Sequence, residues 1–384
     1  MSAPIEFIDL KAQRRRLGER LDAAIRGAIE GGQYILGPQV AEFEKQLAAY
    51  VGVKHVVACA NGTDALLLPL LASGIGPGDA VFVPSFTFAA TAEVVALAHA
   101  EPVFVDVDPD TYNIDIASLE AAIAAIRKEG RLTPKAIIPV DLFGLAADYA
   151  AIDRIAKREK LLVIEDAAQA IGGSSHGRMC GAFGDVASTS FYPAKPLGCY
   201  GDGGAMFTND GALAERLRSF AFHGKGETQY DNVHVGLNSR LDTLQAAILI
   251  EKLAILEDEM VARQAVAKRY AEGLGDAVKV AQIPAGHRSA WAQYAIETPN
   301  RDALKAHLQA NGIPSVIYYV KPLHLQAAYE RYPRTPSGLP VSEGLPSRIL
   351  CLPMHPYLST ADQDRIIETI RAFAAGNPVR VAAA

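Results

Sequence analysis

The chain has 384 residues, enough for about two or three domains with a large hydrophobic core. Half of its residues are hydrophobic and 21% are charged, and its formal net charge of -6 argues against a nucleic-acid partner, which would require a basic stripe. Neither an apolar run of about eighteen residues nor a secretory signal occurs, so we expect no membrane span and a cytoplasmic location. The four cysteines are far apart and lack a CxxC pair, which predicts reduced thiols, no disulfide framework and no metal cluster.

Short apolar segments alternate with helical segments through the first half of the chain. The predicted strands lie at 55–60, 80–88, 102–108, 135–144 and 161–166, and the predicted helices at 63–73, 90–100, 118–130 and 148–160. Buried strands separated by helices of this length predict an α/β fold with a largely parallel sheet covered on both faces. No full helix fits between 186–192 and 205–210, so a hairpin-like or loop connection is expected there.

A long helical segment at 241–274 is predicted to lead into a second domain. That domain reads as mixed α and β, with strand-like segments at 291–298 and 313–320 on either side of a helix at 302–312. We therefore expect a large domain at 1–255, whose N-terminal segment is free to pack elsewhere, and a smaller α+β domain at 256–384.

Lys195 lies in a Gly- and Pro-rich loop after an apolar strand, within SFYPAKPLGCYGDGGA (190–205). Its neighbours are apolar, which indicates partial burial, and burial lowers the pKa of a lysine so that its amine becomes nucleophilic. The alternative is a structural lysine paired with Asp202.

Two acids, Glu165 and Asp166, end the strand in LLVIEDAAQA (161–170), where ligands of parallel sheets bind. An aspartate there can pair with the protonated ring nitrogen of pyridoxal 5'-phosphate (PLP), and Gln169 can reach the same site. The alternative is helix capping by Asp166. A dinucleotide site is rejected, because the glycine cluster at 74–79 follows a helix and contains Pro77.

Two further segments follow strands. In ACANGTDALLL (58–68), Gly62 and Thr63 open a helix whose free amides and dipole suit a phosphate, although Asn61 or Thr63 can equally be a plain N-cap. In PSFTFAATAE (84–93), Phe86 and Phe88 can supply a ring that stacks on a flat cofactor, or can belong to the core.

Together these segments resemble the DegT/DnrJ/EryC1/StrS aminotransferases, which have PLP-dependent fold type I, the aspartate aminotransferase-like fold. The resemblance runs nearly end to end, from GGQYILGPQVAEFEKQLAAYVG (31–52) through NSRLDTLQAAIL (238–249) to CLPMHPYLS (351–359). It implies a homodimer with shared active sites that uses PLP. The residue roles it implies are the Schiff-base lysine for Lys195, the ring-nitrogen partner for Asp166, a neighbour of the ring hydroxyl for Gln169, ring stacking for Phe88, phosphate binding for Gly62, Thr63 and Ser190, and a phosphate contact from the partner subunit for Asn238.

The segments SFYPAKPLGCYGDGGA and NSRLDTLQAAIL are typical of the enzymes that aminate carbon 3 of UDP-2-acetamido-2-deoxy-3-oxo-glucuronate with L-glutamate as donor. Arg240 is our candidate for binding a carboxylate, with a surface arginine as the alternative. Tyr318 and Tyr319 are expected to line the sugar pocket, and Tyr318 stands where the best-known member of this subgroup has His. A carbon-4 aminotransferase of a 4-keto-6-deoxy nucleotide sugar and a non-catalytic PLP-binding regulatory protein are the alternative functions.

Overall fold

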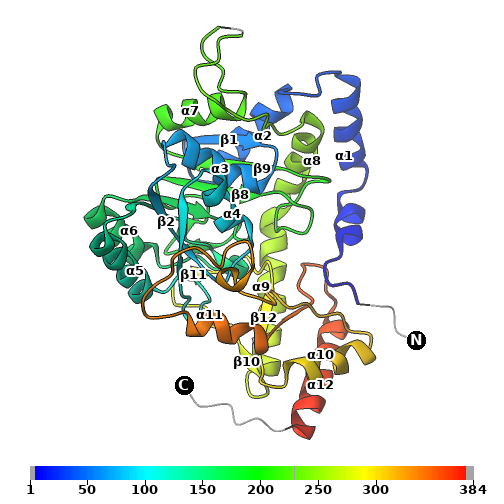
Figure 1. Cartoon of the computed structure of the whole chain (residues 1–384). Coiled ribbons are helices and arrows are strands. Elements are labelled where there is room, and N and C mark those ends of the chain that lie inside the picture. Colours follow the sequence, from blue (N-terminus) through cyan, green and yellow to red (C-terminus); the bar gives the residue numbers. More distant parts are fainter. Residues whose placement is uncertain (1–4, 229, 378–384) are drawn as a thin grey trace.

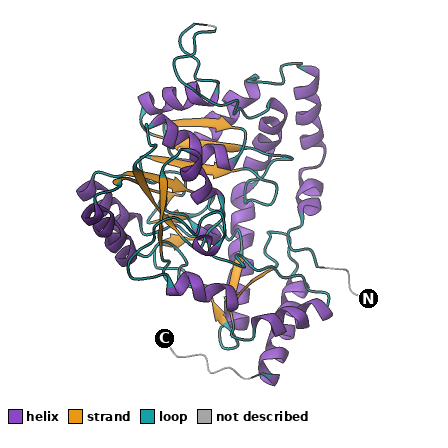
Figure 2. Ribbon diagram, in the orientation of Figure 1, coloured by secondary structure: helices purple, strands orange, loops and turns teal. Residues whose placement is uncertain are grey.

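The computed structural model describes residues 5–228 and 230–377, and its centre is a seven-stranded sheet with helices on both faces (Figures 1 and 2). The strand order is β1-β9-β8-β5-β4-β2-β3. β9 runs antiparallel to its neighbours β1 and β8, whereas the other pairs are parallel. The strands are β1 (His55–Cys59), β2 (Asp79–Pro84), β3 (Glu101–Val105), β4 (Thr133–Ile137), β5 (Leu162–Asp166), β8 (Val186–Ser190) and β9 (Gly204–Thr208).

Two hydrophobic layers hold helices against this sheet. One face is covered by α2 (Pro38–Val51), α5 (Ile116–Glu129), α6 (Tyr149–Glu159) and α8 (Thr243–Leu253). The other face is covered by α3 (Gly62–Ala72), α4 (Ala90–Leu97) and α7 (Gly211–Ala221). Aspartates accept a backbone N–H at the first turns of α5, α6 and α7, and so define where these helices begin. The predicted, mostly parallel α/β fold is confirmed.

The C-terminal part forms a smaller three-stranded antiparallel sheet with helices beside it, at the lower end of the molecule in Figure 1. Its core also includes Ile5 from the N-terminal segment. Next along the chain, α1 (Leu10–Glu30) packs against α8 through Leu17, Leu21 and Ile248. The elements of the C-terminal part are α9 (Leu256–Leu274), β10 (Lys279–Val280), β12 (Tyr294–Glu297), α10 (Arg301–Ala310), α11 (Pro340–Gly344), β13 (Ile349–Leu352) and α12 (Thr360–Gly376). A third small sheet joins β6 (Ser174–Ser175), β7 (Arg178–Met179) and β11 (His287–Arg288).

Some predicted elements were wrong in extent. The helix expected at 241–274 is two helices, α8 and α9, which Ala254 and Ile255 separate. Three acids in the first turn of α9 favour a new N-terminus there. The expected strands at 80–88 and 135–144 end at Pro84 and Ile137. The segment 313–320 forms no strand and keeps one bridge, Val316 with Cys351, because its tyrosines turn to pack beside Phe86. The division of domains at residue 255 stays a prediction.

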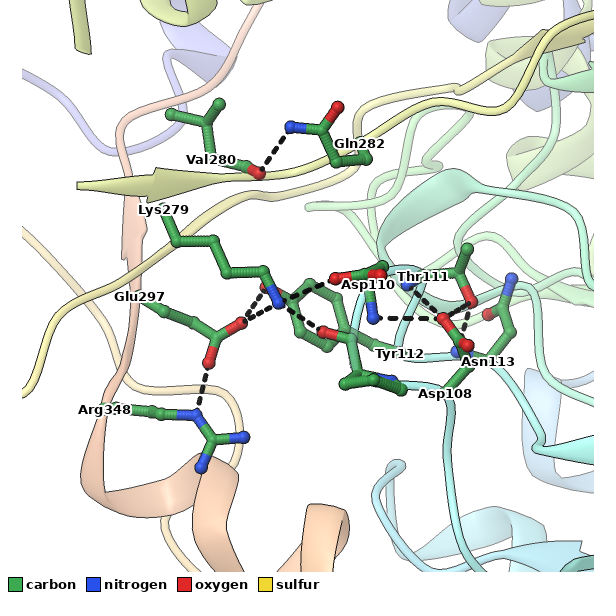
Figure 3. Close-up of polar contacts among 11 residues, drawn as sticks. Asp108, Asp110, Thr111, Tyr112, Asn113, Lys279, Val280, Gln282, Glu297 and Arg348 are labelled. Atoms are coloured by element: carbon green, nitrogen blue, oxygen red, sulfur yellow. Dashed lines mark hydrogen bonds and ion pairs between the residues drawn. The ribbon is translucent and has the colours of Figure 1, made fainter. Parts of the chain in front are cut away.

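Glu297 connects the small sheet to the loop after β3 (Figure 3). Its nearly buried carboxylate accepts a hydrogen bond of 2.8 Å from the Tyr112 hydroxyl and forms ion pairs with Lys279, at 3.1 Å, and with Arg348. Lys279 also pairs with Asp110 at 3.0 Å. The carboxylate is thus compensated by two cations, which fixes this loop to the small sheet.

No helix in the described ranges is long and apolar enough to cross a membrane.

Candidate active site

Three of the predicted site residues lie where neighbouring elements of the large sheet end. Asp166 ends β5, Ser190 ends the adjacent strand β8, and Gly62 opens α3 directly after β1. The Asp166 carboxylate is 5% exposed, and its Oδ1 accepts the N–H of Ala168 while its Oδ2 accepts the Thr91 hydroxyl, both at 3.2 Å. The carboxyl edge of the sheet therefore presents an oriented carboxylate, as expected of a ligand site in an α/β fold.

Lys195 lies in the turn after β8, and its charge interacts with that of Asp166. Burial lowers the pKa of Lys195, and the nearby Asp166 charge raises it only in part. Burial likewise raises the pKa of Asp166, and the Lys195 charge offsets part of that effect. A lysine with a lowered pKa loses its proton more easily, and its neutral amine is suited to nucleophilic chemistry. The acid beside it can accept a cationic partner.

Gly62 lies so close to Ser190 that no side chain would fit. A Cβ at Gly62 would stand 2.6 Å from the Ser190 Cβ. Asn61 caps α3 by accepting the N–H of Asp64 at 2.8 Å, whereas the N–H groups of Gly62 and Thr63 have no hydrogen-bond partner in the described ranges. Free amides at the positive end of a helix form a cradle for an anion such as a phosphate.

Gln169 is buried and held from two sides. Its Oε1 accepts the Phe143 N–H at 2.6 Å, and its Nε2 donates to the Tyr319 hydroxyl at 3.2 Å. Tyr319 packs edge-on against Phe86, with ring centroids 5.8 Å apart. The half-buried Tyr318, the residue before it, packs edge-on against Tyr319. The structure thus brings Tyr319 to Gln169. The cofactor role of Gln169 and the sugar-binding roles of both tyrosines stay predictions.

The two candidate stacking rings differ in exposure. Phe86 is fully buried in a hydrophobic cluster, whereas Phe88, in the loop just before α4, is 60% exposed. A stacking ring must present a face to its ligand, so exposure favours Phe88 over Phe86 for that role.

Asn238 and Arg240 lie on the segment that leads into α8. Asn238 is exposed and forms a bridge with Phe222, while the adjacent Ser239 accepts the N–H of Ala60 at 3.2 Å. The Arg240 guanidinium stands over the Phe222 ring, 4.9 Å from its centroid. The cross-subunit role of Asn238 and the carboxylate role of Arg240 stay predictions.

Several residues that hold the site were missed from the sequence. Thr91 lies in a helical segment without a polar pattern, so nothing in its surroundings indicated the bond to Asp166. Asn113 was missed as well, although its side chain binds the backbone of Leu142 and Leu145 and so fixes the loop that carries Phe143. Lys225 stands over the same ring as Arg240, 5.4 Å from the centroid, and neither cation forms an ion pair in the part of the chain that the structure describes.

The combined residues fit one kind of ligand. It has an anionic group for the α3 cradle, a protonatable ring nitrogen for Asp166, and an electrophilic carbon for the Lys195 amine. PLP has all three features. A residue larger than glycine at position 62 would collide with Ser190 and fill the cradle.

Comparisons with known proteins agree with this chemistry. The chain is 49% identical over 360 residues to UDP-2-acetamido-2-deoxy-3-oxo-D-glucuronate aminotransferase of Pseudomonas aeruginosa, which covers 93% of this chain and 97% of that protein. It is 43% identical over 370 residues to UDP-N-acetyl-3-dehydro-alpha-D-glucosamine 3-aminotransferase of Acidithiobacillus ferrooxidans, with 96% and 97% covered.

Solved structures show the same relationship. A DegT DnrJ EryC1 StrS aminotransferase from Brucella abortus is 72% identical, with a TM-score of 0.96 and 96% of this chain and 99% of that chain covered. The model of the DegT/DnrJ/EryC1/StrS aminotransferase family matches residues 15–371. The chain therefore belongs to the DegT/DnrJ/EryC1/StrS aminotransferase family.

Proposed function

We propose that this protein is a PLP-dependent aminotransferase that transfers the amino group of L-glutamate to carbon 3 of UDP-2-acetamido-2-deoxy-3-oxo-glucuronate. The observation that carries the chemistry is the partly buried Lys195 beside Asp166, at a sheet edge that also holds the Gly62–Ser190 cradle. Amination at carbon 3 is supported by the Pseudomonas aeruginosa and Acidithiobacillus ferrooxidans relatives, whose names both place an oxo or dehydro group at carbon 3 of a UDP sugar. The uronate is supported by the name of the Pseudomonas aeruginosa relative.

Each residue of the site has a defined task in this proposal. PLP, when bound, supplies an electron sink for the carbon that loses a proton. Asp166 holds the proton on the ring nitrogen, which keeps that sink effective, and Thr91 and Ala168 hold the Asp166 carboxylate in place. The Lys195 amine, whose pKa burial lowers, takes the proton from the α-carbon of glutamate.

The substrate anions need cationic partners. Lys225 and Arg240 flank the Phe222 ring and form no ion pair among the described residues, so both guanidinium and ammonium are free for an anion. A UDP-uronate offers a diphosphate and a carboxylate, and glutamate offers two carboxylates. We assign Arg240 to a carboxylate, because a guanidinium binds one through two parallel hydrogen bonds.

The proposal includes a homodimer with shared active sites, located in the cytoplasm and serving the synthesis of surface-polysaccharide sugars such as those of O-antigen. The support for sharing is that Asn238 is exposed, while the adjacent Ser239 is bonded to Ala60, two residues before Gly62. No nucleic-acid or membrane partner is proposed.

One assay tests the function. The PLP-loaded protein is mixed with L-glutamate, and then separately with the 3-oxo-uronate and with a 4-keto-6-deoxy nucleotide sugar, with Lys195→Ala as the inactive control. Amination of the 3-oxo-uronate alone supports the proposal. Amination of the 4-keto sugar alone would replace the substrate, and a protein that fails even to convert glutamate would be a non-catalytic PLP-binding regulator.

A further inference from the structure

Two fully buried carboxyl groups lie directly behind the site. Asp141 and Glu165 are both 0% exposed, and with Cys180 their oxygen and sulfur atoms lie within 4.8 Å of one another. Neither carboxyl forms an ion pair with a lysine, arginine or histidine in the ranges that the structure describes. Two like charges this close in a buried site are strongly disfavoured, so one of the two groups must carry a proton.

The hydrogen bonds indicate where this proton lies. Asp141 Oδ1 accepts the Tyr149 hydroxyl at 2.8 Å and the Ala147 N–H at 3.0 Å, and each Glu165 oxygen accepts one backbone N–H, at 2.6 and 2.7 Å. Asp141 Oδ2 is the one oxygen of the pair without a partner. A proton held by Glu165 and directed at this oxygen satisfies it and leaves one negative charge on the pair.

A metal ion fits this cluster less well than a proton. Three of the four carboxylate oxygens already accept hydrogen bonds, which leaves Asp141 Oδ2 and the Cys180 sulfur as candidate ligand atoms. A structural zinc site requires four ligands, and burial raises the pKa of the Cys180 thiol, so that it stays protonated. Burial also raises the pKa of Asp141 to about 6 and that of Glu165 well above its ordinary value, in agreement with a retained proton.

The pair is connected to the cofactor residues through the loop 139–147. The Asp141 N–H donates to the Asp166 carbonyl at 3.0 Å, and the Asp166 N–H donates to the Pro139 carbonyl at 2.9 Å. Two residues after Asp141, the Phe143 N–H donates to Gln169 Oε1 at 2.6 Å. The same short loop therefore sets the place of both Asp166 and Gln169.

We propose that Asp141 and Glu165 share one proton and act as a positioning pair, which fixes the loop 139–147 and through it Asp166 and Gln169. The functional part rests on the proposed aminotransferase function. The other titratable groups that face the pair are Tyr149 from α6 and Cys180 from the segment after β7, and both stay neutral because burial raises their pKa. The pair is thus the group that titrates in this part of the core.

The shared proton is tested on the holoenzyme without any sugar substrate. In Asp141→Asn the amide takes the place of the proton by donating to Glu165, which then stays ionised. Infrared spectroscopy at neutral pH should show a carboxylic acid band in the wild type that is absent from Asp141→Asn. The wild-type free energy of unfolding should also fall more steeply with rising pH than that of the variant, by the slope of one proton over the range between the unfolded and the folded pKa of the pair.

The sign of that slope follows from the raised pKa. A carboxyl whose folded-state pKa exceeds its unfolded value stabilises the fold below the unfolded pKa, and this contribution is lost as the pH rises through the folded pKa. Equal slopes together with no acid band in the wild type would overturn the proposal, as would one bound metal ion per chain. If Asp141→Asn does not fold, Glu165→Gln serves instead. Its amide can donate to Asp141 Oδ2 while one backbone N–H loses its acceptor, and the acid band should again disappear.

The positioning role has its own measurement. Asp141→Ala removes the acceptor of Ala147 and Tyr149, so we expect a lower kcat for the glutamate half-reaction, a smaller change in KM and an altered visible spectrum of the bound cofactor. Asp141→Asn keeps that acceptor and should recover most of the lost kcat. If both variants lose activity equally while the acid band behaves as expected, the shared proton stands and the positioning role is wrong. If the wild type itself does not convert glutamate, the proposed function fails, and the infrared result is unaffected.

Discussion

The Thr91 hydroxyl donates a hydrogen bond of 3.2 Å to Asp166 Oδ2, which joins the first turn of α4 to the end of β5. The Ala168 N–H holds the other carboxylate oxygen at the same distance. With both oxygens bound, the carboxylate has a fixed orientation before any ligand arrives. Such preorganised charges stabilise a transition state without having to reorganise during the reaction.

Asp166→Asn should therefore bind PLP and lose most of its activity, by on the order of 10²–10³ in kcat, because an amide cannot keep the ring nitrogen protonated. Thr91→Val leaves the charge and removes one hydrogen bond, so its loss should be roughly fivefold, the equivalent of about 1 kcal/mol. Thr91→Ser keeps the hydroxyl and is the matched control. A nearly normal rate for Asp166→Asn would show that Asp166 only caps the following turn.

Lys195→Ala should abolish transamination and leave the fold intact, since its amine is the proposed covalent anchor and base. The wild type should be yellow as purified, and the variant should lose the visible absorption. Lys157→Ala, on the exposed face of α6, is the control and should keep full activity. Appreciable turnover by Lys195→Ala without an added amine would remove this residue from the mechanism.

The pH dependence of the wild type follows from the same burial. Burial lowers the pKa of Lys195, and the neutral amine is the reactive form. Activity in the glutamate half-reaction should therefore rise with pH through an apparent pKa below the ordinary value for lysine. The control is Lys195→Ala with an added small amine as the base. If its activity falls at low pH with the same apparent pKa as the wild type, that pKa belongs to a group other than Lys195.

Residues of the site that follow strands could be predicted from the sequence, and those fixed by distant contacts could not. Asp166 and Gln169 follow an apolar run that marks a strand end, and Gly62 follows another, so their places depend on local pattern. Thr91 and Asp141 contribute through partners far along the chain, and no local pattern reports such a pairing. The segment 313–320 has the composition of a strand, but its tyrosines pack beside Phe86 and leave the sheet, an instance of tertiary contacts overriding local propensity.

Gly62→Ala should weaken cofactor binding severely. The added Cβ would stand 2.6 Å from the Ser190 Cβ, so that α3 or the end of β8 must shift and the amide cradle is distorted. The dissociation constant of PLP, measured on apoprotein by absorbance, should rise by tenfold or more if the distortion costs about 1.4 kcal/mol. Gly27→Ala, in α1 with no atom within 4 Å of the new Cβ, is the matched control and should bind PLP normally. Unchanged PLP affinity in Gly62→Ala would place the phosphate elsewhere.

Shared active sites can be tested by mixing two inactive chains, Lys195→Ala and Asn238→Ala. If Asn238 acts in the partner's site, each heterodimer has one site with both lesions and one with neither, so activity should reappear on mixing. If Asn238 acts in its own chain, as the nearby bond between Ser239 and Ala60 permits, every heterodimer site carries one lesion and stays inactive. Heterodimers are verified by mass spectrometry. Absence of recovery, with both parents severely impaired, contradicts shared sites.

A variant of Arg240 tests whether this residue binds a carboxylate of the substrate. Its guanidinium lies over the Phe222 ring and forms no ion pair among the described residues. A guanidinium can make two parallel bonds to a carboxylate, whereas a lysine makes a single point contact. Arg240→Lys should weaken one half-reaction by about 1.5–3 kcal/mol if the pair is buried. Lys225→Arg, at the other cation near Phe222, is the control for general charge effects.

The two half-reactions are followed separately through the cofactor spectrum. Loss confined to the sugar half-reaction shows that Arg240 reads the uronate, and supports carbon 3 of the oxo-glucuronate as the site of amination. Loss confined to the glutamate half-reaction makes Arg240 a donor clamp and removes the reason to require an acid on the sugar. No loss in either half-reaction contradicts the assignment, and Arg240 is then a surface cation whose contact with Phe222 is purely structural.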